Sequence, residues 1–109
     1  MLSRAEFHVL LSLLESDRHG YGIMQDVEGV TGGEVRLGPG TLYGCLNRML
    51  AAGLVEESDE RPDPELDDER RRYYRITTMG LKTVRAEAQR LSTAVAAARA
   101  RRLLGRASS

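Results

Sequence analysis

Cysteine, tryptophan and long apolar runs are scarce or missing in this chain of 109 residues. The single cysteine, Cys45, excludes an intrachain disulfide and cannot by itself form a structural zinc site. No apolar run approaches the roughly 20 residues that a membrane span needs, and the N-terminus lacks the basic-then-apolar layout of a signal peptide. We therefore expect a cytoplasmic protein with no metal, no disulfide and no membrane span.

The residue patterns of an enzyme are also missing. No nucleophile stands beside a positioned base, no glycine-rich phosphate loop carries its lysine, and the carboxylates lie in solvated runs. We expect neither catalysis nor a cofactor. A length of 109 residues leaves room for one domain, whose modest core would gain from a partner subunit, so we expect a homodimer.

A net charge of zero conceals two parts of opposite sign. Residues 1–69 hold 5 arginines against 15 aspartates and glutamates, a balance of −10. Residues 70–109 hold 10 arginines and one lysine against one glutamate, a balance of +10. Because a local basic face can bind a polyanion while acidic surface lies elsewhere, the overall charge does not exclude a nucleic-acid partner.

The stretch Leu-Gly-Pro-Gly-Thr-Leu-Tyr, residues 37–43, predicts the start of a central helix over residues 39–52. Pro39 suits the first helical position, because its φ is already near the helical value and its missing donor would be unpaired there. The glycines on either side of it keep side chains away from backbone N–H groups that have no intrahelical partner. The hydroxyls of Thr41 and Tyr43 lie beside these groups, and such a helix end attracts phosphate.

Helical spacing divides the central helix into two faces. The inward stripe consists of Leu42, Leu46, Met49 and Leu50. Tyr43, Asn47 and Arg48 are left outward, where an Asn can pair with adenine and an Arg with guanine, and either can reach phosphate. On an arbitrary helix the same side chains are solvated surface, and Thr41 and Tyr43 can serve only to cap and support the helix.

Three small residues mark this helix and its end. Gly53 suits the left-handed residue after the helix, and residues 54–57 continue as a short strand. Gly44 lies inside the helix, where glycine costs about 1 kcal/mol relative to alanine, and no sequence feature accounts for it. Cys45 is expected to be a small packing residue; the alternative is a redox switch, since a helix N-terminus can lower the pKa of a thiol.

Two helices are predicted before the central one. Ser3 and Glu6 match a capping box, which starts the first helix. Its apolar stripe consists of Phe7, Leu10, Leu11 and Leu14, and Val9 and Leu13 widen it; we expect this helix to be largely buried, partly against a second subunit. Residues 17–20 form a polar turn, and residues 21–27 restart helical spacing as a short second helix that residues 31–33 break. Residues 34–37 are a brief strand or an extended linker.

A hairpin is predicted after the central helix. Residues 58–69 are too rich in Asp, Glu and Pro to be buried, and residues 70–76 resume a strand pattern, so the two strands enclose a long tip, the wing. The basic run Arg70, Arg71 and Arg72 either faces phosphate or is occupied by the acidic residues 63–69, which would then compete with DNA.

Four aromatic side chains have mainly structural interpretations. Tyr73 and Tyr74 alternate faces on the strand, so one is expected in the core and the other near solvent or DNA, with core packing favoured for the pair. His8 and His19 have no second ligand at metal-binding spacing and are expected to be structural.

Thr77 or Thr78 caps a last helix, whose apolar residues step alternately by three and four as in a coiled-coil seam. The seam spans under three heptads and is rich in alanine, so it pairs with its twin only with help from the first helix. The expected dimer contacts are Phe7, Leu11, Leu81, Val84, Ala88, Leu91, Val95 and Ala98. A basic tail over residues 99–106 follows.

The order of helix, short helix, central helix, hairpin and long helix is that of a winged helix-turn-helix domain with a dimerisation helix appended. The predicted fold is therefore mainly α with a small β-hairpin. We divide it into a winged helix-turn-helix DNA-binding domain over residues 1–77 and a dimerisation helix with a basic tail over residues 78–109.

Four motifs are more specific than this order. They are His-Gly-Tyr-Gly-Ile at 19–23, the stretch at 37–43, Leu50 with Gly-Leu-Val at 53–55, and Arg-Tyr-Tyr-Arg-Ile-Thr at 72–77 with Gly80. Together they resemble the PadR family of bacterial transcriptional regulators over about residues 5–82. The single helix after the wing resembles its short subfamily.

This resemblance implies a homodimeric repressor that binds an inverted-repeat operator in double-stranded DNA and leaves it when a small molecule or stress signal arrives. It implies that the second helix and the start of the third meet the major groove, while the wing meets the backbone or minor groove. The DNA-binding positions to which it points are Tyr21, Gln25, Pro39, Gly40, Thr41, Tyr43, Asn47, Arg48, Arg70, Arg71 and Arg72.

A second interpretation is a protein-interaction adaptor that keeps the winged domain but no longer binds DNA. The acidic first two-thirds of the chain favour it. Salt separates the two, because a DNA-binding dimer loses affinity log-linearly with ionic strength, whereas an adaptor ignores DNA.

Overall fold

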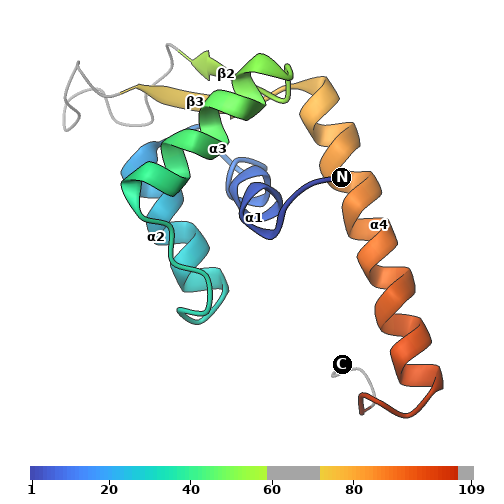
Figure 1. The fold of residues 1–109 in the computed structure, drawn as a ribbon. Helices are drawn as coiled ribbons and strands as arrows, with labels where there is room; N and C mark the ends of the chain where they lie inside the picture. Colours follow the sequence, from blue (N-terminus) through green and yellow to red (C-terminus); the bar gives the residue numbers. More distant parts are fainter. Residues whose placement is uncertain (59–71, 106–109) are drawn as a thin grey trace.

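The computed structural model describes residues 1–58 and 72–105, so the acidic segment 63–69, Arg70 and Arg71 lie outside the described residues. The described elements are α1 (Arg4–Ser12), β1 (Arg18–His19), α2 (Gly20–Val30), α3 (Pro39–Ala51), β2 (Val55–Ser58), β3 (Tyr73–Ile76) and α4 (Thr78–Ala100). α1 lies at the centre, between α2 and α3 on one side and the first part of α4 on the other (Figure 1). The mainly α fold with a small sheet is confirmed.

α1 begins at the predicted capping box. Ser3 Oγ accepts a hydrogen bond from the Glu6 backbone N–H at 3.1 Å, and the Glu6 carboxylate accepts one from the Ser3 N–H at 2.9 Å. The backbone hydrogen bond from Ser3 is the main reason that the pKa of Glu6 lies below its ordinary value. Both ends of the box are therefore satisfied, and the helix start is well defined.

The buried face of α1 is one part of the predicted apolar side. Val9 and Leu10 are fully buried, whereas Phe7 and Leu11 are half-buried and Leu14 is 45% exposed. The core therefore buries Leu10 of the stripe together with the widening residues Val9 and Leu13. The outer members of the stripe lie at the margin of the core, where a second chain can still reach them.

The segment between α1 and α2 is not the plain turn that was predicted. Arg18 and His19 form the two-residue strand β1, which pairs with β3. His19 also caps α2, because its Nδ1 accepts a hydrogen bond from the Gly22 N–H at 3.1 Å. α2 runs to Val30, directly before the predicted break at residues 31–33, where Gly32 has a φ of +62°.

α3 starts at Pro39 as predicted, and Gly53 takes the left-handed conformation after it, with φ +76°. The inward side chains Leu42, Leu46 and Met49 are completely buried. The preceding residues 34–37 form no strand and are an extended linker, which the buried side chains of Val35 and Leu37 hold against the core.

β3 is the central strand of a three-stranded antiparallel sheet with the order β1-β3-β2. Val55 lies opposite Ile76 and Ser58 opposite Tyr73. Tyr73 and Tyr74 are both buried although they point to opposite faces, which agrees with the core packing favoured for the pair. β3 begins at Tyr73 and not within the arginine run, so Arg72 precedes the strand.

α4 is fixed at its start to the connection between α3 and β2. Thr77 Oγ1 accepts a hydrogen bond from the Gly80 N–H at 3.0 Å and donates one to the Gly53 carbonyl at 2.6 Å. A Cβ at Gly80 would lie 2.0 Å from the Leu54 carbonyl oxygen, so only glycine fits. Val84 then completes the core, where it is 3% exposed.

The second half of α4 leaves the rest of the chain. Every residue over 88–96 is exposed, and the helix continues as far as Ala100, so roughly 20 Å of helix projects beyond Glu87. Figure 1 shows this half extending away from the sheet and from α1. Among the described helices, none combines the length and the apolar character that crossing a membrane requires.

Candidate nucleic-acid interface

The first turn of α3 faces solvent. Gly38 is its N-cap, with φ −73° and ψ 163°, and no side chain in the described structure caps the helix. Pro39, Gly40 and Thr41 are exposed. Thr41 therefore does not cap α3, which was one of its two predicted roles. The unpaired backbone N–H groups of this turn remain open to an anionic partner.

The side chain of Tyr43 on α3 lies over the start of α2. A Cβ at Gly20, the first residue of α2, would lie 2.5 Å from Tyr43 Oη, so glycine makes room for the tyrosine of α3. Tyr43 is 45% exposed and Tyr21 is 58% exposed. Gln25 is exposed one helical turn after Tyr21. Gly20 was not predicted as a site residue, although it belongs to the first motif.

The outward face of α3 is centred on small side chains. Gly40, Gly44, Asn47 and Ala51 follow one another by steps of four, three and four residues, which places them in one line along the helix. A Cβ at Gly44 would make only an ordinary contact, at 3.5 Å, with Arg48 Nη1. Crowding within the chain therefore does not require this glycine. Because glycine adds no side chain to the outward face of α3, another molecule can approach the helix backbone there.

The guanidinium of Arg48 is held between Glu6 of α1 and Cys45, which lies one turn earlier in α3. Its Nε is 3.6 Å from a carboxylate oxygen of Glu6, and its Nη2 donates to Cys45 Sγ at 3.4 Å. The side chain of Arg48 is 62% exposed, so the guanidinium can exchange Glu6 for another anion. Cys45 itself is 1% exposed, and burial raises the pKa of its thiol, which fits the packing role.

Of the predicted basic run in the wing, the structure describes only Arg72. Arg72 Nη1 donates to the Glu57 carboxylate across the hairpin at 3.1 Å, and the two side chains are 73% and 50% exposed. Arg72 is thus already paired, but in water-exposed surroundings where the pair is weak. The other two arginines of the predicted run, Arg70 and Arg71, lie outside the described residues.

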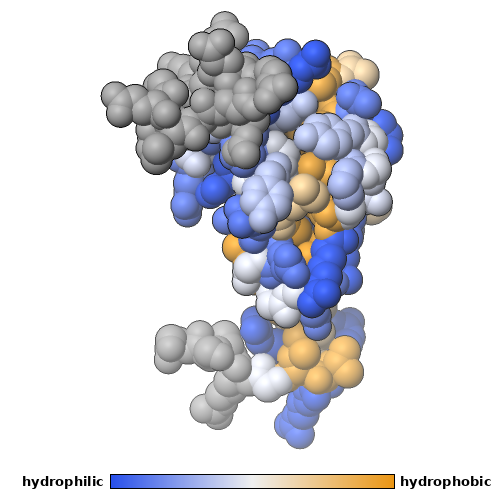
Figure 2. Space-filling model, turned by 90° about the vertical axis from the view of Figure 1, so that its left-hand side faces the viewer, coloured by the Kyte–Doolittle hydropathy of each residue, from blue (hydrophilic) through white to orange (hydrophobic). Residues whose placement is uncertain are grey.

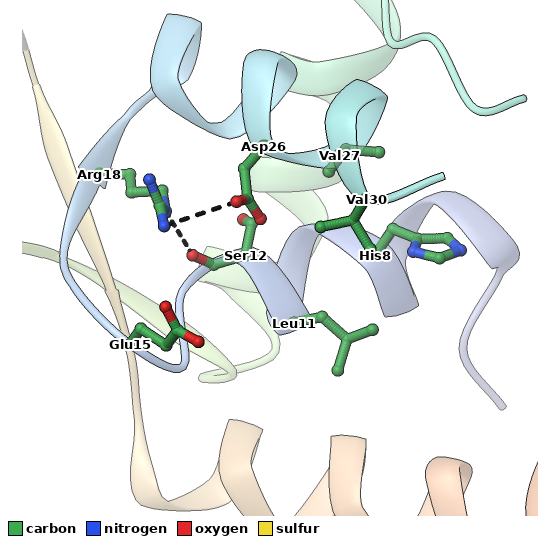
Figure 3. Close-up of a pocket in the computed structure, with 8 residues that line it drawn as sticks. All are labelled: His8, Leu11, Ser12, Glu15, Arg18, Asp26, Val27 and Val30. Atoms are coloured by element: carbon green, nitrogen blue, oxygen red, sulfur yellow. Dashed lines mark hydrogen bonds and ion pairs between the residues drawn. The ribbon is translucent and has the colours of Figure 1, made fainter. Parts of the chain in front are cut away.

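Arg18 fixes α2, which carries two predicted site residues, against α1. Its Nε donates to the Ser12 carbonyl at 2.6 Å, and its Nη2 is 3.6 Å from an Asp26 carboxylate oxygen. Figure 3 shows this arginine reaching between the two helices, at the side of a small pocket that His8 and Val30 also line. No sequence pattern predicted the contact, because its members lie on three separate elements.

In the winged part, residues 1–77, the arginines that the structure describes are all paired. Each of the six whose surroundings are described forms an ion pair with a carboxylate within the same part: Arg4, Arg18, Arg36, Arg48, Arg72 and Arg75. In three of these pairs, those of Arg4, Arg36 and Arg72, both side chains are at least half exposed, and exposed pairs contribute at most about 1 kcal/mol each. A phosphate can therefore replace a carboxylate at little cost.

The predicted dimer contacts fall into two groups. Val84 is buried in the subunit's own core, so its assignment to the seam was wrong, because no surface is left for a partner. The others stay partly or largely accessible: Phe7, Leu11, Leu81, Ala88, Leu91, Val95 and Ala98. Figure 2 shows a hydrophobic cluster at the far end of the molecule, where α4 ends and where Leu103 is 78% and Leu104 47% exposed.

These elements and their order define a winged helix-turn-helix protein. The chain matches the model of the transcriptional regulator PadR-like family over residues 9–86, and it therefore belongs to this family. A relative in Streptomyces fradiae, an uncharacterized 37.1 kDa protein in transposon TN4556, is 35% identical over 88 residues. That alignment covers 81% of this chain but only 23% of the relative.

Solved structures show the same fold. A PadR family regulator from Clostridium difficile has a TM-score of 0.74 and 23% identity, with 94% of this chain and 100% of that chain covered. PadR of Bacillus subtilis, solved in complex with operator DNA, has a TM-score of 0.64 and 15% identity, with 81% of this chain and 48% of that chain covered.

Proposed function

We propose that this protein is a sequence-specific DNA-binding transcriptional regulator that acts in the cytoplasm as a homodimer. Its operator is an inverted repeat, and its mode is repression that a small molecule or stress signal releases, as expected of the family. Residues 1–77 form the DNA-binding domain, and residues 78–109 form the dimerisation helix and tail.

The observation that carries the proposal is the exposed, uncapped start of α3, with the start of α2 beside it. The uncapped first turn of α3 offers backbone N–H groups, and the start of α2 lies beside it, under Tyr43. Phosphate binds well at such ends, because unpaired N–H groups and the helix dipole both favour negative charge. Tyr21, Thr41 and Tyr43 add exposed hydroxyls around this point.

The small side chains on the outward face of α3 support entry of this helix into the major groove. A groove about 12 Å wide admits a helix, and small side chains let its backbone come close to the bases. Asn47 is exposed on this face and carries an amide that can pair with adenine. Arg48 binds phosphate or guanine after it leaves Glu6.

The uncovered half of α4 supports the dimer. Leu91 and Val95, both exposed, continue the line of Val84 beyond the subunit's own core. A helix that projects with an apolar stripe gains stability when an identical stripe covers it. For two recognition helices related by a twofold axis, operator half-sites should repeat at about 10 base pairs or a multiple of it.

Selection of DNA from a random pool by the purified protein tests the proposal. The expected result is an enriched inverted repeat whose binding weakens log-linearly with salt concentration. No enrichment and no binding at low salt would contradict it.

A matched pair of amide variants tests the assigned site. Asn47→Ala should relax base preference at one position in each half-site, at a cost of about 1–3 kcal/mol per half-site. Gln89→Ala removes an equally exposed amide from α4 and should leave both affinity and preference unchanged. Equal effects of the two variants would remove Asn47 from the interface.

The adaptor remains the second candidate, and one observation favours it. The described part of the chain before α4 holds six arginines and eight acidic side chains, so its surface does not attract a polyanion at long range. An adaptor of this kind would show no electrophoretic shift of DNA at any salt concentration, whereas the proposed regulator binds at low salt.

A further inference from the structure

Three polar side chains from three segments meet on one face of the sheet. Arg75 Nη2 donates to Ser58 Oγ at 2.6 Å and lies 3.5 Å from Asp17 Oδ2. Ser58 Oγ in turn donates to Asp17 Oδ2 at 2.6 Å. We refer to Asp17, Ser58 and Arg75 as the triangle.

The strand register explains why these residues meet. Arg18 pairs with Tyr74 in antiparallel strands, so Asp17 lies across from Arg75. Ser58 pairs with Tyr73, which places its side chain diagonally across from that of Arg75 on the same face. The central strand therefore bridges the two outer strands through one guanidinium.

Burial makes the triangle more than a surface ion pair. Ser58 is 9% exposed, and the side chains of Asp17 and Arg75 are 23% and 37% exposed. Hydrogen bonds that involve charged groups are stronger than neutral ones, the more so away from water. Within the described residues Arg75 Nε is buried and has no hydrogen-bond partner, which is a cost that stability alone does not explain.

The triangle joins α2 to the wing, and the resemblance to the family implies that the wing meets the DNA backbone or minor groove. Asp17 directly precedes β1, whose His19 caps α2 with its Tyr21 and Gln25. Ser58 and Arg75 belong to the two strands of the wing. A hairpin of two four-residue strands is marginal alone, so its orientation depends on such links.

From this geometry we propose that Asp17 is a positioning residue for DNA binding, which holds the wing in register with α2 through Ser58 and Arg75. The inference rests on the proposed function. It predicts a change in DNA affinity opposite to the electrostatic one. Removing a negative charge near DNA should by electrostatics alone strengthen binding, whereas loss of the positioning carboxylate should weaken it.

The test compares Asp17→Asn with Glu56→Gln in the full-length protein. Glu56 is an exposed carboxylate on the same face of the sheet, opposite Arg75, and forms no ion pair in the described structure. Asp17→Asn should weaken binding to the selected operator about tenfold or more, as expected from the loss of a charged hydrogen bond. Glu56→Gln should leave it unchanged or slightly tighter. Operator binding by Asp17→Asn at wild-type strength or better would overturn the proposal.

Amide hydrogen exchange in the free protein gives a readout that needs no DNA. Asp17→Asn should speed exchange in β2 and β3 about tenfold while amides of α1 keep their protection. Unchanged exchange in the hairpin would overturn the proposal even if DNA binding fell. If the wild-type protein bound no DNA, the proposed function would fail, and exchange alone would decide whether Asp17 positions the wing.

Ser58→Ala repeats the test with both charges kept. It removes the bridging hydroxyl, so it should also weaken operator binding and speed exchange in β2 and β3. The double variant Asp17→Asn, Ser58→Ala should lose no more than the stronger of the two single variants. Additive losses would show that Asp17 and Ser58 act separately and would overturn the triangle as a unit. This variant also decides the question if Asp17→Asn does not fold.

Discussion

The winged part and the second half of α4 differ in how many of their arginines are paired with carboxylates and in whether their apolar side chains are buried. In the winged part each described arginine has a carboxylate partner, and the large apolar side chains of α3 are buried. On the second half of α4 and at its C-cap, Arg99 and Arg101 donate to backbone carbonyls and have no ion pair among the described residues, and Leu91 and Val95 are exposed. The first region is complete as a folded unit, whereas the second has surface that nothing in the same chain covers.

This difference separates two kinds of partner. A surface whose arginines form weak, exposed ion pairs with carboxylates suits a ligand that competes for those arginines, as phosphate does. An apolar stripe on a bare helix suits a second helix. The boundary between the two regions is the docking of Gly80 and Val84, and each prediction below tests one side of it or the boundary itself.

The largest effect is expected at the boundary. Gly80→Ala places a Cβ against the Leu54 carbonyl and should lower the free energy of unfolding by about 3 kcal/mol or more, measured by urea denaturation. Gly29→Ala is the control, because this helical glycine has open space around it and should gain up to about 1 kcal/mol. If Gly80→Ala were as stable as wild type, α4 would not be docked as described.

Charges on the apolar stripe should separate the subunits without unfolding the winged part. The double variant Leu91→Glu, Val95→Glu should raise the dimer dissociation constant at least about tenfold in sedimentation equilibrium, since an unpaired buried charge costs more than 1.4 kcal/mol. The same charges at Gln89 and Thr93, on the opposite side of α4, should leave assembly unchanged. A dimer indifferent to the first pair would place the interface elsewhere.

Removing one arginine from each region should show which of them stabilises the fold. Arg18→Met leaves the Ser12 carbonyl and Asp26 without their partner and should cost about 1–3 kcal/mol in thermal or urea unfolding. Arg85→Met on α4 should stay within about 0.5 kcal/mol of wild type. Equal costs would mean that the arginines of the winged part are as dispensable as those of α4.

The smallest effect concerns reactivity. Because burial raises the pKa of the Cys45 thiol, the native protein should react with iodoacetamide at pH 8 at less than about a tenth of the rate of the unfolded chain. Ser92→Cys in a Cys45→Ser background should react at the unfolded rate, since position 92 is exposed. A raised pKa also means that this group's contribution to stability is present at neutral pH and is lost only as pH rises into the alkaline range in which thiols ionise.

Local signals predicted the elements well. The Ser3 capping box, Pro39 at the first position of α3 and Gly53 after its end all act through neighbouring backbone atoms, so the sequence alone can indicate them. Motif wording also placed the chain in its family. Strand β1 was missed, because a strand of two residues is too short to show a periodic pattern. Val84 was wrongly assigned to the dimer seam, because residue spacing does not indicate whether the same chain or a partner covers a side chain.

The sequence by itself thus determined which helices form, where they begin and which of their faces are apolar, since these depend on contacts a few residues apart. Only the tertiary structure decided that Tyr43 lies over Gly20, that Arg48 turns back to Glu6, and that Asp17, Ser58 and Arg75 meet on one face of the sheet. Such contacts join residues up to 58 positions apart, and they arise from strand register and helix packing that no local pattern encodes.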